Sequence, residues 1–532
     1  MTRNPDLTRA FVAIALLSLS VLMVGCGGGP YVYPSGTILS SSVSGTQNPL
    51  VAAYSIQTAL ECAGQVAVEF GPDTTYGRLT AWYPTSGNLQ QSTILVAGMR
   101  ASTAYHMRAL AQCPGSTTPI ATADTTFTTG PLPALAFPKL TVTRPNPVPS
   151  SPENPGIELI DVTATGTPAL FTDRDANPIW YYDVGSGNYP YVFKLLPNGH
   201  ILMIITDAGN LGISTLREID LAGNTIREMD TPTLGQKMQA AGYNFIPNTY
   251  HHDFLLLNSG HVIVLTNFLN NVNSPTGYSG ATPVLGDGLI DLDENWNPVW
   301  AWNSFDYLSP NRHLNGLPDW THSNAIVYSP SDGNLFLSMR HQSWVLKINY
   351  NNGSGSGNVL WHLGYQGDFD LTNNGVPTDD PSLWFSFQHF PSIVNQNGPQ
   401  TTLAVWDNGD NRVLDDSGDV CGAAPSFVPC YSRPAVLNLD EGAMVADLLW
   451  ANPLPYFGVW GGSINQLGNG NVEFDLNAPA VAPAPNVASQ VQEITQTATP
   501  QVVWQMQISP SSATAYRAYR VPSLYPGVSW PY

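Results

Sequence analysis

Residues 292–303 read LDENWNPVWAWN, a turn that leads into an apolar strand rich in tryptophan. Asp and Asn before a run of Val, Trp and Ala are typical of a turn followed by a β-strand. The combination of a turn and a strand ending in Trp or an equivalent residue recurs in residues 172–183, 220–230, 357–364, 439–452 and 497–506. Six such copies predict six sheets, each with the same outer strand.

Further turn–strand units lie upstream of several copies, for example PNGHILMI (197–204) and DGNLFLS (332–338). Only 11% of the 532 residues are charged, Gly and Pro are abundant, and long amphipathic helices are absent, so the chain is expected to be all-β. Two stacked sandwiches would not explain a recurring outer strand. Residues 157–532 are therefore predicted to form a six-bladed β-propeller with long insertions.

The region before the repeats differs in pattern. Residues 31–132 contain short alternating runs and predict a small β-sandwich, and VAGMRASTAYHMRALAQC (96–113) resembles a strand of fibronectin type III modules. Residues 133–156 are rich in proline and predict an extended connector. The sequence leaves open whether the sandwich is a spacer, a packing partner or the contact of a homodimer.

The first 26 residues have the features of an export signal. Arg3 and Arg9 precede an apolar stretch over 11–24, which is short for a membrane span. Cys26 directly after Gly25 resembles a bacterial lipobox, in which that cysteine carries lipid. The expected location is the periplasm, with outer-membrane anchoring through Cys26 as the only membrane contact; ordinary secretion is the alternative.

The other four cysteines form two local sets. Cys62 and Cys113 lie in the predicted sandwich, and Cys421 and Cys430 flank one loop. Exported proteins can hold disulfides, so the pairs Cys62–Cys113 and Cys421–Cys430 are predicted, although other pairings across domains are formally allowed. The absence of a CxxC pattern argues against zinc.

The formal net charge is −20, from 19 basic and 39 acidic residues. Nucleic-acid binding requires a basic surface, and the sequence contains no basic cluster that would provide one. A negative exterior also repels anions at long range, so an anionic substrate would need strong local donors.

Three successive blades are expected to begin their innermost strands with histidine, in YHHDFLLLNSG (250–260), THSNAIVYS (321–329) and QHFPSIVNQ (388–396). Such strand starts converge at one mouth of a propeller channel. Folding the hairpin 321–342 places His322 opposite Arg340, with Asn324 on the same face as His322. The same folding places Asn267 opposite His252 and Asp407 or Asn408 opposite His389. Five further histidines are read as turn or rim residues: His106, His200, His261, His313 and His362.

Two kinds of chemistry fit these residues. Three neutral imidazoles could bind a metal ion. Alternatively, one imidazole could be the nucleophile in transfer of an anionic group, with Arg340, Asn324 and the other histidines as donors. Arg340 favours transfer, because a guanidinium suits an oxyanion and is poorly placed beside a metal cation. A third reading is a binding propeller without turnover.

The stretches HHDF (251–254), THSNAIVYS (321–329), LSMRHQSWVLKI (337–348), FQHFPSIV (387–394), VWDNGDNR (405–412) and AYRAYRVPSLYPG (515–527) resemble bacterial arylsulfate sulfotransferases. The resemblance covers about residues 135–532. It implies a periplasmic six-bladed propeller that moves a sulfuryl group from a phenolic sulfate donor to a phenolic acceptor, without a nucleotide donor or any cofactor.

The resemblance also assigns roles. His389 matches the transiently sulfurylated histidine, and His252, His322, Asn324 and Arg340 match the other active-site residues. A covalent N-sulfated imidazole implies ping-pong kinetics, with His252 or His322 as acid and base.

Other assignments follow less directly. Either His251 or His252 could match the family's active-site histidine, and His252 is preferred because it adjoins Asp253. Trp384, Phe387 and Asn408 are expected to contact substrate, although ordinary packing explains the aromatics equally well. The family's small disulfide loop matches Cys421–Cys430, whereas a lipid on Cys26 departs from the family.

Overall fold

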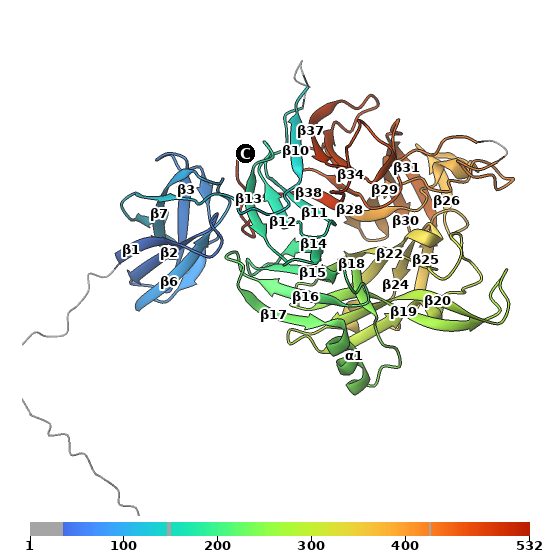
Figure 1. Ribbon diagram of the computed structural model, residues 1–532, viewed down its shortest axis with the longest axis horizontal. Helices are drawn as coiled ribbons and strands as arrows, with labels where there is room; N and C mark the ends of the chain where they lie inside the picture. Colours follow the sequence, from blue (N-terminus) through green and yellow to red (C-terminus); the bar gives the residue numbers. More distant parts are fainter. Residues whose placement is uncertain (1–35, 146–150, 425–426, 532) are drawn as a thin grey trace, which may run out of the picture.

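The computed structural model describes residues 36–145, 151–424 and 427–531, and within them the chain is nearly all β-strand (Figure 1). The export signal and Cys26 lie outside these residues. The described α-helices are α1 (Thr231–Ala240) and α2 (Ser304–Tyr307), and short 3-10 turns cover Arg340–Gln342, Asn351–Gly353 and Pro381–Leu383. No described helix has the length and hydropathy needed to cross a membrane.

Two antiparallel sheets at the N-terminal end share one apolar core. The first has the order β1-β2-β6: β1 (Thr37–Gly45), β2 (Ala52–Ala59) and β6 (Leu89–Val96). The second has the order β4-β3-β7-β8, with β5 on β3 and β9 on β7: β3 (Gly64–Gly71), β4 (Arg78–Leu79), β5 (Tyr83–Thr85), β7 (Ala104–Gln112), β8 (Ile120–Ala121) and β9 (Thr125–Thr128). The predicted disulfide Cys62–Cys113 is confirmed here.

Six further sheets follow, antiparallel except for the parallel pair β26–β31 in the fifth, and none of them closes on itself. The first sheet contains β38 (Ala515–Val521), β11 (Ile157–Val162), β12 (Ala169–Thr172) and β13 (Pro178–Tyr182). The second contains β14 (Asn188–Leu195), β15 (Ile201–Asp207), β16 (Ser214–Ile219) and β17 (Thr225–Asp230). The third contains β18 (Thr249–Leu256), β19 (Val262–Asn273), β20 (Ala281–Leu292) and β21 (Pro298–Asn303).

The last three sheets follow the same plan. The fourth contains β22 (Ser323–Ser329), β23 (Asn334–Met339), β24 (Trp344–Ile348) and β25 (Val359–Leu363). The fifth contains β28 (His389–Asn397), β29 (Gln400–Asp407), β30 (Arg433–Asp440) and β31 (Val445–Ala451), extended by β26 (Asp370–Asn373) and β27 (Val376–Pro377). The sixth contains β33 (Ser463–Gln466), β34 (Val472–Asn477), β36 (Ser489–Ile494), β37 (Val502–Ser509) and β10 (Lys139–Thr143). A small pair joins β32 (Phe457–Gly458) to β35 (Pro479–Val481).

The six sequence repeats form β13, β17, β21, β25, β31 and β37, each the fourth strand of its sheet. The turn before three of them is built alike. In these turns an aspartate accepts a hydrogen bond from the backbone N–H of an asparagine four residues later, in the pairs Asp173–Asn177, Asp220–Asn224 and Asp293–Asn297. Gly223, which precedes Asn224, has φ of 88°, a conformation that glycine adopts without strain. In these three copies the repeat therefore encodes one turn geometry.

The repeat tryptophans connect neighbouring sheets. Each indole N–H donates to the turn before the outer strand of the next sheet, in the pairs Trp180–Leu221, Trp300–Gly355, Trp361–Glu441, Trp450–Thr497 and Trp504–Arg174. The last pair runs from the sixth sheet to the first. Only the second sheet lacks the tryptophan, and there Arg227 donates to the carbonyl of Glu294 at 2.6 Å.

The inner strands of the six sheets follow the same circular order as the tryptophan contacts. β14, β18, β22, β28, β33 and β38 contact one another in succession, and β38 contacts β14. The C-terminal strand β38 thus pairs with β11 from the start of the repeats. Residues 139–143, expected to lie in an extended connector, instead form β10 at the edge of the sixth sheet. An edge strand tolerates neighbouring prolines, which explains the difference.

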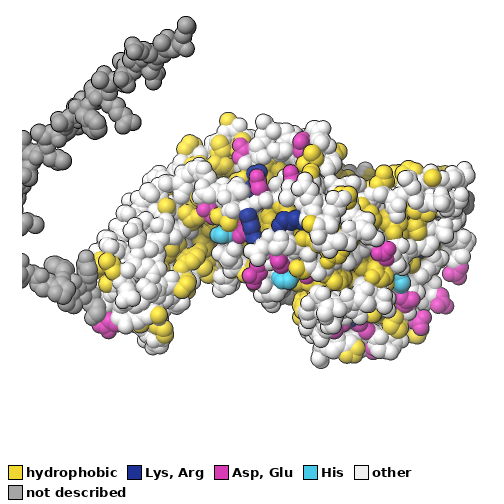
Figure 2. Space-filling view, turned by 90° about the horizontal axis from the view of Figure 1, so that it is seen from below, with side chains coloured by type: hydrophobic (Ala, Val, Ile, Leu, Met, Phe, Trp, Pro, Cys, Tyr) yellow, Lys and Arg dark blue, Asp and Glu magenta, His cyan; other side chains and the backbone are white. Residues whose placement is uncertain are grey.

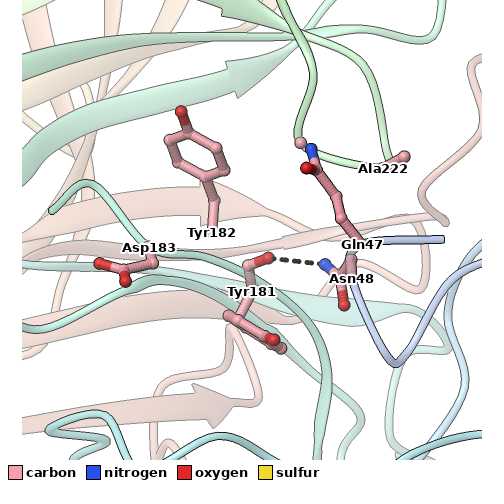
Figure 3. A pocket seen from close by; sticks show the side chains of 7 residues that line it. Gln47, Asn48, Tyr181, Tyr182, Asp183 and Ala222 are labelled. Carbon is pink, nitrogen blue, oxygen red and sulfur yellow. Dashed lines mark hydrogen bonds between the residues drawn. The ribbon is translucent and has the colours of Figure 1, made fainter.

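Side-chain hydrogen bonds connect the N-terminal sheets to the first two of the six later sheets (Figure 3). Asn48 donates from its side chain to the carbonyl of Tyr181 at 2.9 Å, and Gln47 donates to Asn224 at 3.2 Å. A pocket of about 320 Å³ lies between these segments, and none of the predicted site residues lines it. Figure 2 shows hydrophobic side chains spread over one face of the molecule and the visible Lys and Arg side chains gathered near its middle.

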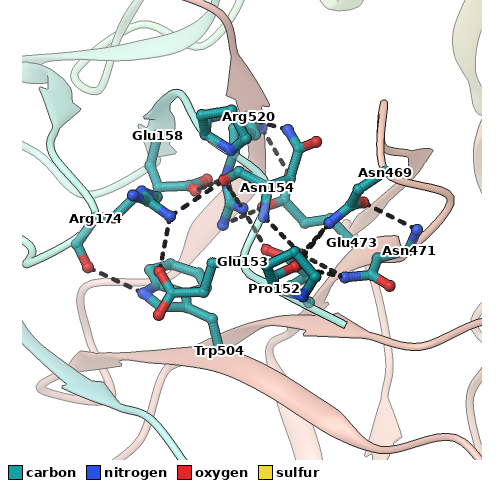
Figure 4. A network of polar contacts seen from close by, with 12 residues as sticks. Pro152, Glu153, Asn154, Glu158, Arg174, Asn469, Asn471, Glu473, Trp504 and Arg520 are labelled. Carbon is teal, nitrogen blue, oxygen red and sulfur yellow. Dashed lines mark hydrogen bonds and ion pairs between the residues drawn. The ribbon is translucent and has the colours of Figure 1, made fainter. Parts of the chain in front are cut away.

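A buried ionic network joins the first and sixth sheets (Figure 4). Arg520 contacts Glu158 at 2.6 Å, Glu473 at 3.1 Å and Glu493, and all four side chains are almost fully buried. Three carboxyl groups thus surround one guanidinium. Burial and the neighbouring charge of Glu158 raise the pKa of Glu473 well above its usual value.

Replacing Arg520 with methionine is expected to lower the free energy of unfolding by about 3–5 kcal/mol, because the carboxylates would remain buried without a cation. Chemical denaturation of wild type and Arg520→Met measures the loss. Arg217→Met is the control, since Arg217 pairs with the half-exposed Glu228 and should change stability by about 1 kcal/mol or less. Equal losses in the two variants would contradict the importance of the network.

Candidate active site

The structure brings the three predicted histidines together. They lie at or near the starts of β18, β22 and β28, which contact one another. The ring centroids of His252 and His322 are 4.7 Å apart. The ring of Tyr516 on β38 lies 5.4 Å from His252 and 6.0 Å from His389. The site therefore joins three sheets and the C-terminal strand.

Each of the three strands is irregular where its histidine lies. The pairing register shifts between Tyr250 and Phe254 in β18, between Ser323 and Ala325 in β22, and between His389 and Ser392 in β28. Such bulges redirect side chains and often occur next to active sites. His252 and His322 also adopt left-handed conformations, with φ of 57° and 50°. Conformations of this kind cost about 1–3 kcal/mol each and tend to cluster at functional sites.

The bulges overturn three register predictions. His389 pairs with Trp406 and not with Asp407 or Asn408, although its ring still bonds the side chain of Asn408. Asn267 pairs with Thr249 and not with His252, because the extra residues in β18 displace the pairing. Asn324 is the extra residue in β22, so it does not share a face with His322; its side chain donates to the carbonyl of Gln388 at 2.7 Å. It thereby fixes the peptide bond just before His389.

His389 is 1% exposed and both of its ring nitrogens have partners. Nδ1 is 2.7 Å from Oδ1 of Asn408, and Nε2 accepts a hydrogen bond from the backbone N–H of Gly461 at 3.2 Å. The amide nitrogen of Asn408 donates to the carbonyls of Gly458 and Gly461, which fixes Oδ1 toward the ring. Nδ1 therefore carries the proton, and Nε2 keeps its lone pair.

Electrostatics favour the neutral form of this ring. Burial, followed by the charge of Arg340, holds the pKa of His389 well below 6.5 despite the hydrogen bond to Asn408. Burial and the neighbouring His322 and His251 likewise hold the pKa of His252 well below 6.5. A neutral imidazole at neutral pH is a competent nucleophile.

Arg340 begins a 3-10 turn directly after β23, and its side chain is 11% exposed. Its guanidinium donates to the carbonyl of Val459 at 2.9 Å and to Nε2 of His341 at 2.5 Å, and it lies over the ring of Phe387. Its nearest carboxylate, Asp410, is 3.7 Å away. Burial lowers the pKa of Arg340, but an arginine stays charged at neutral pH. The group can therefore attract an anion.

The structure shows which of the two candidate histidines of β18 faces the site. His251 is buried with Nε2 3.3 Å from Asp287, whereas His252 faces His322 and the rings of Tyr191 and Tyr516. Of the residues expected to contact substrate, Asn408 bonds His389 and Phe387 lies at the site. Trp384 instead packs in the apolar core of the fourth and fifth sheets. We therefore assign Trp384 to the packing of these two sheets.

Sequence reasoning missed Asp319, His341 and Tyr516. The ligand atoms of Asp319, His322 and His341 lie within 4.8 Å of one another, a spacing that could hold a metal ion. Both nitrogens of His341 are already bonded, however: Nδ1 to the carbonyl of Asp319 at 2.8 Å and Nε2 to Arg340. Both ring nitrogens of His389 are bonded as well. The group of histidines around Arg340 therefore suits an anion better than a metal ion.

The disulfide Cys421–Cys430, which closes the loop after β29, is also confirmed. Cys421 lies close to the site loop, with its sulfur 3.2 Å from the carbonyl of Gly409. Gly409 immediately follows Asn408, the partner of His389. The cross-link therefore stabilises the segment that orients the predicted nucleophile.

Similar solved structures are remote. A protein of unknown function from Bacteroides caccae is 9% identical over 74% of this chain and 94% of its own, with a TM-score of 0.31. A duf4221 family member from Bacteroides vulgatus is 9% identical over 73% and 98%, with a TM-score of 0.26. A variant of an ACO/RPE65 chimera is 11% identical over 90% and 94%, with a TM-score of 0.31. TM-scores this low establish no shared fold.

No curated protein matches the sequence. The family model described as Arylsulfotransferase (ASST) matches residues 150–520, which include the three histidines, Asn324 and Arg340. This match covers most of the chain and confirms the resemblance carried by the sequence motifs. The chain therefore belongs to the arylsulfotransferase family, and this membership implies a sulfotransferase that acts on phenolic substrates.

Proposed function

We propose that this protein moves a sulfuryl group from a phenolic sulfate ester to a phenolic acceptor in two steps, through an N-sulfated His389. The observation that carries the proposal is the fixed tautomer of His389. Asn408 holds its Nδ1 proton, and Nε2 is left unprotonated beside Arg340 and two further histidines. No nucleotide sulfate donor enters the reaction.

The proposed scaffold is a six-bladed propeller with its site at one mouth of the central channel. Two observations support it: the inner strands contact one another in an order that returns to its start, and the outer strands are joined in the same circular order. The fibronectin-like sandwich and the catalytic propeller are accordingly proposed as separate domains. The two disulfides support export, because such bonds persist in oxidising compartments.

In the first step the lone pair on Nε2 of His389 attacks sulfur, and the bond from sulfur to the phenolic oxygen breaks. His252 or His322 donates a proton to the departing phenolate. Arg340 balances the charge on the sulfuryl oxygens in a loose, in-line transition state. The N–H of Gly461, which bonds Nε2 in the free protein, becomes available to one of these oxygens.

In the second step the acceptor phenol gives its proton to the same histidine and attacks sulfur. The nitrogen–sulfur bond breaks, and Nε2 recovers its lone pair. Asn408 stabilises the positive ring of the intermediate by accepting a hydrogen bond from Nδ1–H throughout. The covalent intermediate divides one transfer into two, which gives ping-pong kinetics.

The first step should remain fast in mild acid. Because the folded protein holds the pKa of His389 well below 6.5, the nucleophile stays neutral through the pH range in which a free imidazole becomes protonated. Single-turnover release of nitrophenolate from para-nitrophenyl sulfate, quenched into alkali, is expected to stay nearly constant as the pH falls from about 7.5 to about 5.5. A decline centred near the pKa of free histidine would contradict a buried neutral nucleophile.

Steady turnover tests the proposed function. Nitrophenolate release from para-nitrophenyl sulfate is measured with and without phenol, in the absence of nucleotides. Continued release only when phenol is present is expected for a transferase. Release into water alone would indicate a hydrolase, and no release by folded protein would overturn the proposal.

A further inference from the structure

Asp319 contacts both histidines that flank Arg340. Its carboxylate Oδ2 lies 2.6 Å from Nδ1 of His322, and its backbone carbonyl accepts a hydrogen bond from Nδ1 of His341 at 2.8 Å. The rings of His322 and His341 are 4.4 Å apart and tilted by 30°. One residue in the loop before β22 therefore holds two imidazoles side by side.

These contacts fix both tautomers. An ionised carboxylate only accepts hydrogen bonds, so Nδ1 of His322 carries the proton and Nε2 is left for the substrate. His341 donates from Nδ1 and accepts from Arg340 at Nε2. Burial and the charge of His322 lower the pKa of His341 to about 4, so this ring stays neutral and can keep accepting from Arg340.

Asp319 also distinguishes His322 from the other two histidines of the site. The groups that face His322 besides Asp319 are His252 on β18, His341 in the 3-10 turn and His389 on β28, and none of them is acidic. Asp319 supplies the carboxylate that accepts a hydrogen bond from Nδ1 of His322. Burial raises the pKa of Asp319, but the hydrogen bond from His322 and the neighbouring histidines together outweigh it and hold this pKa below its usual value, so the carboxylate is ionised at neutral pH.

We propose that Asp319 is a positioning residue that makes His322, and not His252, the general acid and base of sulfuryl transfer, while His341 aligns Arg340. The inference rests on the proposed function. The reaction starts with protons on both ring nitrogens of His322. In the first step the Nε2 proton passes to the leaving phenolate, and His322 becomes neutral with its Nδ1 proton still bonded to Asp319. In the second step Nε2 takes the proton of the acceptor phenol, which restores the starting state.

The test compares two donors in the first half-reaction, followed as a single turnover without acceptor. Nitrophenolate leaves easily, whereas unsubstituted phenol, which like tyrosine has a pKa of about 10, needs a proton as it departs. Asp319→Asn should slow phenyl sulfate cleavage by about 10²-fold or more and para-nitrophenyl sulfate cleavage by about tenfold or less. Equal losses with both donors would overturn the role of Asp319 in proton transfer.

Asp368→Asn is the matched control. Asp368 holds Nδ1 of His362 at 2.8 Å in the same manner, on the loop after β25, and neither residue belongs to the site. This variant should cleave both donors at the wild-type rate. Thermal unfolding of Asp319→Asn shows whether the fold persists, and Asp319→Glu, which keeps the carboxylate, should recover part of the phenyl sulfate rate.

A readout without turnover separates this inference from the proposed function. Nitrogen NMR of the free protein, with His322→Gln to identify the resonance, should show Nδ1 of His322 protonated in wild type and a mixture of tautomers in Asp319→Asn. If wild type cleaves no aryl sulfate, the proposed function fails while the spectrum still tests the tautomer. A wild-type spectrum with Nε2 protonated and Nδ1 bare would overturn the inference.

Discussion

Replacing His389 with alanine is expected to abolish sulfuryl transfer while the fold persists. The variant lacks the nitrogen that the site presents as a fixed, unprotonated nucleophile, so the covalent path is lost. We expect the turnover of para-nitrophenyl sulfate with phenol to fall by at least about 10³-fold. Initial rates with both substrates saturating measure the loss.

Truncating a buried side chain also costs stability, here on the order of 1–3 kcal/mol, because a cavity forms and Oδ1 of Asn408 loses its partner. Thermal unfolding therefore accompanies the assay. His362→Ala, which removes a half-exposed histidine outside the site, is the control and should retain wild-type activity. Turnover close to that of wild type in His389→Ala would remove this residue as the nucleophile.

Replacing Arg340 with lysine should have the next largest effect, a fall in kcat of about 10²–10³-fold with a smaller change in KM. A lysine keeps the positive charge but cannot reproduce the planar set of donors that reaches His341, Val459 and a sulfuryl oxygen together. The loss concentrates in kcat because charge on the sulfuryl oxygens is greatest in the transition state.

Steady-state kinetics of Arg340→Lys and of the control Arg217→Lys separate this role from general charge. Arg217 pairs with Glu228 on the second sheet, outside the site, and its replacement should leave both constants unchanged. A loss of less than about tenfold in kcat for Arg340→Lys would contradict a guanidinium that acts on the transition state.

Much of the fold could be predicted because its signals are local. The turn and outer strand of each repeat lie within about a dozen residues, and every copy identified in the sequence forms the fourth strand of a sheet. The copy without tryptophan was also recognised. Arg227 occupies the tryptophan position there and donates a hydrogen bond to the next sheet, as the tryptophans do. Either residue type can therefore connect two neighbouring sheets at this position.

The site was predictable in membership but not in geometry. Ideal alternation along a strand placed Asn324 beside His322, whereas the bulge in β22 turns it toward Gln388. Sequence alone also could not choose between His251 and His252, because the choice depends on which one the bulge of β18 directs toward His322. Asp319 could have been noticed only from its position three residues before His322, a weak signal in a loop.

If His389 carries the sulfuryl group between donor and acceptor, mass spectrometry of the trapped enzyme should detect it there. Protein mixed with para-nitrophenyl sulfate in the absence of acceptor is quenched at neutral to alkaline pH and digested. We expect a mass increase of one sulfuryl group on His389, which disappears when phenol is added before the quench. A sulfuryl group on another residue, or continued transfer to phenol with His389 never modified, would contradict it.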